Sequence, residues 1–120
     1  MAYARPKTIF CDIDGTLLKH ERPSKSALSE FSPEIIEGTL EKLLEWDEKG
    51  YNIILVTGRK ESMRATTERQ LSSVGIFYDQ LIMGIGGGER ILINDKKPDG
   101  SQTCKSICIE RDVGISNIEI

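Results

Sequence analysis

The sequence predicts an α/β domain built on a parallel β-sheet, and three observations lead to that prediction. Apolar segments of strand length alternate with longer segments of helical periodicity. The segment YNIILVTGR at residues 51–59 is nearly all apolar, as in a strand covered by helices on both faces. Polar residues follow three of the expected strands, at the ends where a parallel sheet places its ligand site. A length of 120 residues favours a single domain over residues 1–120.

The first strand is expected over residues 8–13, and a helix follows it. Ser32 is a good N-cap residue and Pro33 suits the first turn, so the helix is expected to begin there and to close at Lys49 and Gly50. Its apolar stripe is formed by Ile36, Leu40, Leu43 and Leu44.

The second strand, over residues 51–56, is expected to be central in the sheet. A more polar helix over about residues 60–74 ends at Gly75, and its narrow buried face is formed by Met63, Thr67, Leu71 and Val74. Further strands are predicted at residues 80–83, 90–94 and 106–110.

The segment GIGGGE at residues 84–89 is too short to contain a helix. It is either a taut crossover between parallel strands or the turn of an antiparallel hairpin. Its glycines indicate conformational freedom rather than a phosphate-binding loop, because neither a helix nor a Lys-Ser/Thr pair follows them.

Composition and charge narrow the classes of function. The formal net charge is −3, without the basic excess of a typical nucleic-acid binder, so nucleic acid is not supported as a partner. The apolar runs are too short for a membrane span and no secretory signal is recognised, which favours a cytoplasmic protein and no membrane partner. Three cysteines and one histidine, His20, indicate reduced thiols rather than a disulfide or a zinc site.

Three carboxylates are expected to meet at the carboxyl edge of the sheet: Asp12, Asp14 and Asp95. Clustered carboxylates repel one another unless a cation lies between them, and Mg²⁺ prefers such oxygen ligands. Thr57 and Gly58 offer a hydroxyl and backbone amides at the start of a helix, where a phosphate group binds well. This combination suits a phosphate monoester.

The same residues carry a resemblance to a known family. DIDGTLL resembles the first signature of the haloacid dehalogenase-like (HAD) phosphohydrolases, ILVTGR is similar to their second motif, and ILINDKKPD is similar to their acidic fourth motif. The resemblance covers about residues 7–110 and implies a Rossmann-like sheet with the strand order 3-2-1-4-5 and helices on both faces.

The resemblance also implies the roles of the site residues. Asp12 would attack phosphorus and form an aspartyl-phosphate, while Asp14 would act as general acid and then as general base. Thr57 and the Gly58 amide would hold the phosphoryl oxygens. Asp12, the backbone carbonyl of Asp14, and Asp95 would hold Mg²⁺ as the cofactor.

Gly15 permits the chain to leave the strand sharply, and Thr16 can hydrogen-bond back to the aspartate loop. We group these two residues with Gly58 and Arg59 as the substrate-binding set. The family's third motif normally supplies a lysine, but MGIGGGER contains none, so Lys97, or else Lys96 or Arg59, is expected to supply the cation.

The sequence also predicts the positions of two further residues near the fourth motif. Arg90 is expected at the start of its strand, away from the site. Asp99 is either a metal ligand through water or a turn residue, and the turn is favoured.

The spacing leaves no room for a cap domain, only for a flap over residues 15–32. The expected enzyme is a Mg²⁺-dependent phosphatase of a phosphorylated small molecule, such as a sugar phosphate or nucleotide-linked sugar, or of a larger phosphoester. A lid from a second copy in a homo-oligomer would enclose a small substrate. The alternatives are a phosphatase of nucleic-acid or protein phosphoesters and a non-catalytic, receiver-like module. No role is assigned to residues 111–120.

Overall fold

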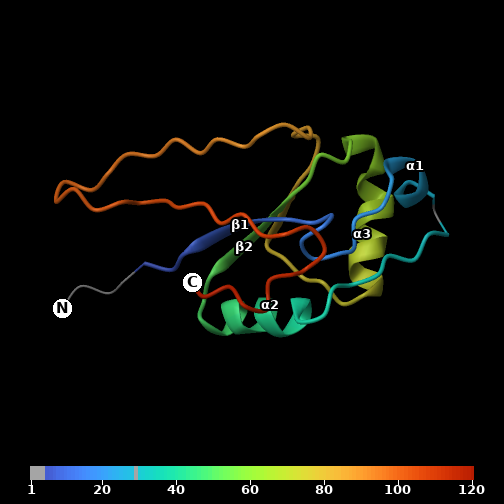
Figure 1. The fold of residues 1–120 in the computed structure, drawn as a ribbon, viewed down its shortest axis with the longest axis horizontal. Helices are drawn as coiled ribbons and strands as arrows, with labels where there is room; N and C mark the ends of the chain where they lie inside the picture. Colours follow the sequence, from blue (N-terminus) through green and yellow to red (C-terminus); the bar gives the residue numbers. More distant parts are fainter. Residues whose placement is uncertain (1–4, 29) are drawn as a thin grey trace.

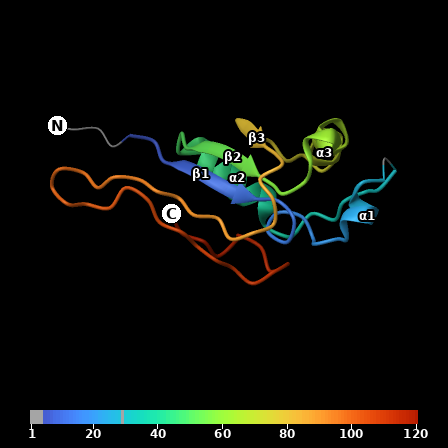
Figure 2. The same ribbon diagram turned by 90° about the horizontal axis from the view of Figure 1, so that it is seen from above.

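In the computed structural model, drawn in Figure 1, the chain folds around a three-stranded parallel sheet with the order β1-β2-β3, and Figure 2 labels all three strands. The strands are β1 (Thr8–Asp12), β2 (Asn52–Val56) and β3 (Gln80–Ile82). The structure describes residues 5–28 and 30–120, so the predicted domain over residues 1–120 and the flap over residues 15–32 both include residues outside the described part.

Helical segments connect consecutive strands. The first connection contains α1 (Pro23–Ser26) and α2 (Thr39–Glu48), and the second contains η1 (Glu61–Met63) and α3 (Arg64–Ser73). The predicted α/β, Rossmann-like fold is confirmed, and the 3-2-1 part of the predicted strand order is present. None of the helices in the described part of the chain combines the length and apolar character needed to cross a membrane.

One face of the sheet forms the core. Cys11, Leu55 and Leu81 are neighbours in register across the three strands, and all three are buried. Because side chains alternate along a strand, residues in this register share one face. Helix side chains complete the same buried cluster: Leu43 and Trp46 from α2 and Leu71 from α3. Full burial of side chains of this size contributes about 1.5–3 kcal/mol each.

The opposite face of the sheet is more open. Phe10 is 53% exposed and Ile82 is 39% exposed, although both are apolar. The predicted helices on both faces are therefore not what the described residues form. The reason is topological: both crossovers step across the sheet in the same direction, and right-handed crossovers then place their helices on the same face.

The predicted fourth and fifth strands are not formed. Residues 90–110 make an extended arm, drawn in orange and red, that leaves the carboxyl edge of the sheet and reaches back toward the amino ends of the strands (Figures 1 and 2). The side chains of Ile91 and Ile93 are 77% and 89% exposed. Near the tip the two limbs are joined by hydrogen bonds from Asn94 to Thr103 and from the Lys97 amide to the Ser101 carbonyl. The outgoing limb runs antiparallel to β1 and the returning limb runs parallel to it, and neither forms a ladder with the sheet.

Helix α2 begins later than predicted. Its N-cap is Gly38, with φ of 88°, rather than Ser32. A Cβ at Gly38 would lie 2.7 Å from the Ser116 Cβ, so this close approach together with the left-handed backbone requires glycine there. The helix ends at Lys49 and Gly50 as predicted, but Leu40 and Leu44 of the expected stripe are exposed.

Candidate active site

The aspartate loop, residues 12–18, begins at the last residue of β1 and brings two carboxylates to the carboxyl edge of the sheet. Ile13 is fully buried between Asp12 and Asp14, and its carbonyl accepts hydrogen bonds from the amides of Leu17 and Leu18 at 2.9 and 3.0 Å. Gly15 has φ of 88°, a backbone conformation that residues with a Cβ rarely adopt. The buried Ile13 anchors the turn, and the aspartates on either side of it remain partly exposed.

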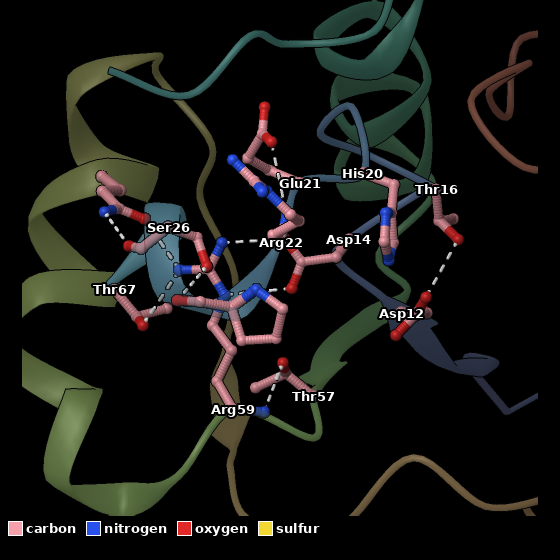
Figure 3. Close-up of polar contacts among 12 residues, drawn as sticks. Asp12, Asp14, Thr16, His20, Glu21, Arg22, Ser26, Thr57, Arg59 and Thr67 are labelled. Atoms are coloured by element: carbon pink, nitrogen blue, oxygen red, sulfur yellow. Dashed lines mark hydrogen bonds and ion pairs between the residues drawn. The ribbon is translucent and has the colours of Figure 1, made fainter. Parts of the chain in front are cut away.

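Both carboxylate oxygens of Asp12 accept a hydrogen bond. Thr16 Oγ1 donates to Oδ2 at 3.3 Å, so Thr16 makes the bond back to the aspartate loop that the sequence suggested (Figure 3). Arg90 Nη1 donates to Oδ1 at 3.1 Å. The prediction that Arg90 lies away from the site is therefore wrong: the segment after the glycines begins at the carboxyl edge instead of ending there.

Asp14 is held by a bidentate ion pair with Arg59. Arg59 Nε donates to Oδ2 at 3.0 Å, and Nη2 donates to Oδ1 at 2.8 Å. The remaining terminal nitrogen, Nη1, donates to Thr67 Oγ1 at 3.2 Å and to Gln70 Oε1 at 2.7 Å, both on α3 (Figure 3 labels Thr67). The Arg59 side chain is only 6% exposed. Arg59 thus connects Asp14 to α3 and has little surface left for a substrate.

The Thr57 loop, residues 57–59, follows β2 and is closed on itself. Thr57 is buried, and its hydroxyl accepts a hydrogen bond from the Arg59 amide at 3.1 Å. The hydroxyl hydrogen of Thr57 and the Gly58 amide are the groups expected to meet phosphoryl oxygens.

The glycine loop, residues 84–89, packs directly on the Thr57 loop. The amides of Gly84 and Ile85 donate to the carbonyls of Arg59 and Thr57 at 2.7 and 3.3 Å. A Cβ at Gly58 would lie 2.8 Å from the Gly86 carbonyl oxygen, closer than real Cβ contacts come. Close approach at Gly58 is therefore a physical reason for a glycine there, in addition to the backbone freedom predicted for the glycine loop.

The chain after the arm clamps the aspartate loop. The Asp112 amide donates to the Gly15 carbonyl at 2.8 Å, and Asp112 Oδ1 accepts from the His20 amide at 2.7 Å. Asp112 itself has φ of 65°, a rare conformation for a residue with a side chain. The sequence alone assigned no role to this segment. Asp112 lies 92 positions from His20 in the sequence, and no motif links the two residues, so their contact could not be predicted.

The structure does not bring Asp95 or Lys97 to the two aspartates. Both lie exposed in the arm, where Asp95 accepts a hydrogen bond from Thr103 through its carbonyl. Within residues 5–28 and 30–120, no three His, Cys, Asp or Glu side chains are grouped closely enough to hold a metal ion. The predicted set of Asp12, Asp14 and Asp95 required residues 90–94 to run parallel to β1, and they run the other way.

Two groups, one in β1 beside the site and one in the turn of the arm, have shifted pKa values. Burial, and secondarily the charge of Asp12, raises the pKa of the Cys11 thiol to about 12. Hydrogen bonds from the Ser101 hydroxyl and amide lower the pKa of Asp99, which therefore caps the turn of the arm. Asp99 is thus a turn residue, the interpretation that the sequence favoured.

Comparison with known proteins finds one family. The HAD model of the polynucleotide kinase PNKP phosphatase domain matches residues 6–91. A solved chain from the "Structure of Pnkp1/Rnl/Hen1 complex" is 30% identical, with a TM-score of 0.57 over 72% of this chain. The match spans 30% of that longer chain. No curated protein sequence matches significantly.

These matches overturn the prediction that nucleic acid is unsupported as a partner, because the matching family is the phosphatase domain of a polynucleotide kinase. The prediction rested on the net charge of −3, which is an average over the whole chain. A net charge averaged over the chain does not report the charge at the site, where two arginines, Arg59 and Arg90, pair with the two aspartates.

Proposed function

Because the chain belongs to the HAD phosphatases, in the family of the polynucleotide kinase PNKP phosphatase domain, we propose that it removes the terminal phosphate monoester of a polynucleotide strand. Phosphates inside a strand are diesters, so the monoester available to a phosphatase lies at a strand end. The match over residues 6–91, which includes both aspartates and the Thr57 loop, carries this proposal. It replaces the expected sugar phosphate.

The open edge of the site supports a large substrate. The flap contributes one short helix, α1, and the Gln70 side-chain amide donates to the Ser26 carbonyl at 2.8 Å, so the flap is attached to α3. The described residues leave this edge open, and an open site selects poorly for small molecules by enclosure but admits the end of a chain.

In the first chemical step, an Asp12 oxygen attacks phosphorus and forms an aspartyl-phosphate. The bond from phosphorus to the terminal oxygen of the strand breaks, and Asp14 gives that oxygen a proton, so the strand leaves with a free hydroxyl. The Thr57 hydroxyl and the Gly58 amide hold the phosphoryl oxygens during the transfer.

In the second step, water attacks phosphorus while Asp14 accepts its proton. The bond from phosphorus to Asp12 breaks, inorganic phosphate leaves, and the Asp12 carboxylate is restored. Arg59 acts as a positioning residue in the second step, because its two bonds to the Asp14 carboxylate fix the direction of the group that accepts the proton of water.

The residues present fit a Mg²⁺ ion. The Asp12 side chain is 36% exposed at the carboxyl edge, and Mg²⁺ needs only one or two carboxylates, with water and substrate oxygens as its other ligands. The Asp12 carboxylate and the Asp14 backbone carbonyl would hold it. When bound, the ion neutralises negative charge on the phosphoryl group.

The test compares oligonucleotides carrying a 3′- or a 5′-terminal phosphate with a sugar phosphate, each with Mg²⁺ and with EDTA. We expect kcat/KM for one of the oligonucleotides to exceed that for the sugar phosphate by at least tenfold, and no release of phosphate by Asp12→Asn or in EDTA. Preference for the sugar phosphate would refute the substrate class, and activity that survives in Asp12→Asn would refute the mechanism.

A further inference from the structure

The site contains two arginines whose environments differ. Arg59 uses Nε, Nη1 and Nη2 on protein acceptors, and its side chain is 6% exposed. Arg90 makes one hydrogen bond, from Nη1 to Asp12, and its side chain is 41% exposed. Within the described part of the chain Arg90 has no other polar partner.

We propose that Arg90 is the cation that binds the transferred phosphoryl group beside Asp12. The proposal rests on the proposed function, and it assigns to Arg90 the part that the sequence left to Lys97, Lys96 or Arg59. A guanidinium has five N–H donors in one plane, so Arg90 can keep its bond to Asp12 while other donors reach a phosphate oxygen.

The location of the contact supports this role. Arg90 Nη1 lies 3.1 Å from Asp12 Oδ1, which puts a positive charge directly beside the carboxylate that would attack phosphorus. Positive charge at that position reduces the repulsion between an anionic nucleophile and an anionic phosphate group. The other Asp12 oxygen accepts from Thr16, so the two partners hold the carboxylate from different sides.

The backbone that leads to Arg90 is anchored. Gly84 and Ile85 are hydrogen-bonded to the Thr57 loop, and Gly86 lies against Gly58. Arg90 therefore follows a segment fixed to the loop that is expected to hold the phosphoryl oxygens. Lys96 and Lys97, in contrast, lie near the tip of the arm, which reaches toward the amino ends of the strands (Figure 2).

If Arg90 had a purely structural role, its substitution would mainly lower the stability of the fold. Ion pairs between partly exposed side chains contribute little to stability, so the pair with Asp12 adds little to the stability of the fold. Substitution of Arg90 should accordingly change phosphate binding and turnover far more than it changes unfolding.

The experiment measures phosphate binding and turnover separately. The variants are Arg90→Ala, Arg90→Lys and Lys97→Ala. Lys105→Ala is the matched control, because this substitution also removes one positive charge from the arm. Binding of inorganic phosphate is measured by calorimetry, turnover on the terminally phosphorylated oligonucleotide, and stability by urea unfolding.

We expect Arg90→Ala to weaken phosphate binding at least tenfold and to lower kcat/KM by about 10²-fold, with unchanged unfolding. Arg90→Lys should recover part of both, and Lys105→Ala should match the wild type. Equal phosphate binding by the wild type and Arg90→Ala, or a loss confined to Lys97→Ala, would overturn the proposal. Failure of the proposed function is recognised separately, as turnover that persists in Asp12→Asn or an absence of wild-type turnover while phosphate binding still depends on Arg90.

Discussion

Asp14 and Arg59 face each other in a two-bond ion pair, with N–O distances of 2.8 and 3.0 Å, and the arginine is almost completely enclosed. The same guanidinium donates hydrogen bonds to the side-chain oxygens of Thr67 and Gln70 on α3. One side chain thereby fixes the relation between the aspartate loop, the Thr57 loop and α3.

Replacement of Arg59 by alanine should destabilise the protein by about 3 kcal/mol, because it leaves a partly buried carboxylate and two buried polar side chains without their partner. Urea unfolding followed by the fluorescence of the single tryptophan, Trp46, measures the change. Arg69→Ala, at an exposed position of α3, should change stability by less than about 0.5 kcal/mol. Equal losses in the two variants would contradict the central role of Arg59.

Asp14→Asn should slow hydrolysis of the aspartyl-phosphate by about 10²-fold or more, because an amide cannot accept the proton of the attacking water. With an aryl phosphate, whose leaving group needs no proton from Asp14, the phosphorylated enzyme should then accumulate. It should appear in intact-mass spectra as one added phosphoryl group, which peptide mapping should place on Asp12. The double variant Asp12→Asn/Asp14→Asn is the control and should acquire no phosphate. A phosphoryl group found on another residue would argue against Asp12 as the nucleophile.

Gly58→Ala should impair both folding and turnover, because its Cβ would lie 2.8 Å from the Gly86 carbonyl oxygen and one of the two loops would have to move. We expect a loss of about 1–3 kcal/mol in stability. Gly87→Ala is a matched control, since its Cβ would have nothing within 4 Å. Comparable behaviour of the two variants would mean that the contact between the loops is unimportant.

Alkaline pH should destabilise the fold through Cys11. Its pKa is raised from 9.0 to about 12 by burial, so the folded state keeps the proton while the unfolded thiol loses it above pH 9. This contribution to stability is complete below pH 9 and is lost progressively as the pH rises from 9 to about 12. Unfolding of the wild type should therefore show a steeper fall in stability above pH 9 than unfolding of Cys11→Ala.

The same shift predicts thiol reactivity. At pH 8 the exposed Cys104 and Cys108 should react quickly with a thiol reagent, while buried Cys11 should react only after unfolding. Mass mapping of the labelled protein distinguishes the sites. Labelling of Cys11 at the rate of the other two would show that its burial does not protect it.

Much of the fold could be predicted from the sequence because its signals are local. The apolar run before Asp12 and the segment before Thr57 form strands, and the polar residues after them lie together at the sheet edge. The end of α3 before Gly75 also follows from local chemistry, since that glycine has φ of 84°.

The path of residues 90–110 and the start of α2 could not be predicted, because they depend on contacts between residues far apart in the sequence. Residues 90–94 have the composition of a strand, yet they find no ladder partner, so Asp95 is carried away from Asp12 and Arg90 is carried to it. Ser32 has the chemistry of an N-cap, but the close contact between Gly38 and Ser116 sets the start of α2 further along. Tertiary contacts of this kind override local preference.

The position of β1 at one edge of the sheet determines how this architecture can be extended. Any strand added beside β1, whether from this polypeptide or from another, would bring the residues near its end to about one strand spacing, ~4.8 Å, from Asp12. A strand added beside β3 would lie about three spacings from β1 and could not contribute to the same chemistry. The two edges of the sheet therefore differ. A strand added beside β1 can place new side chains next to Asp12, whereas a strand added beside β3 can only enlarge the sheet.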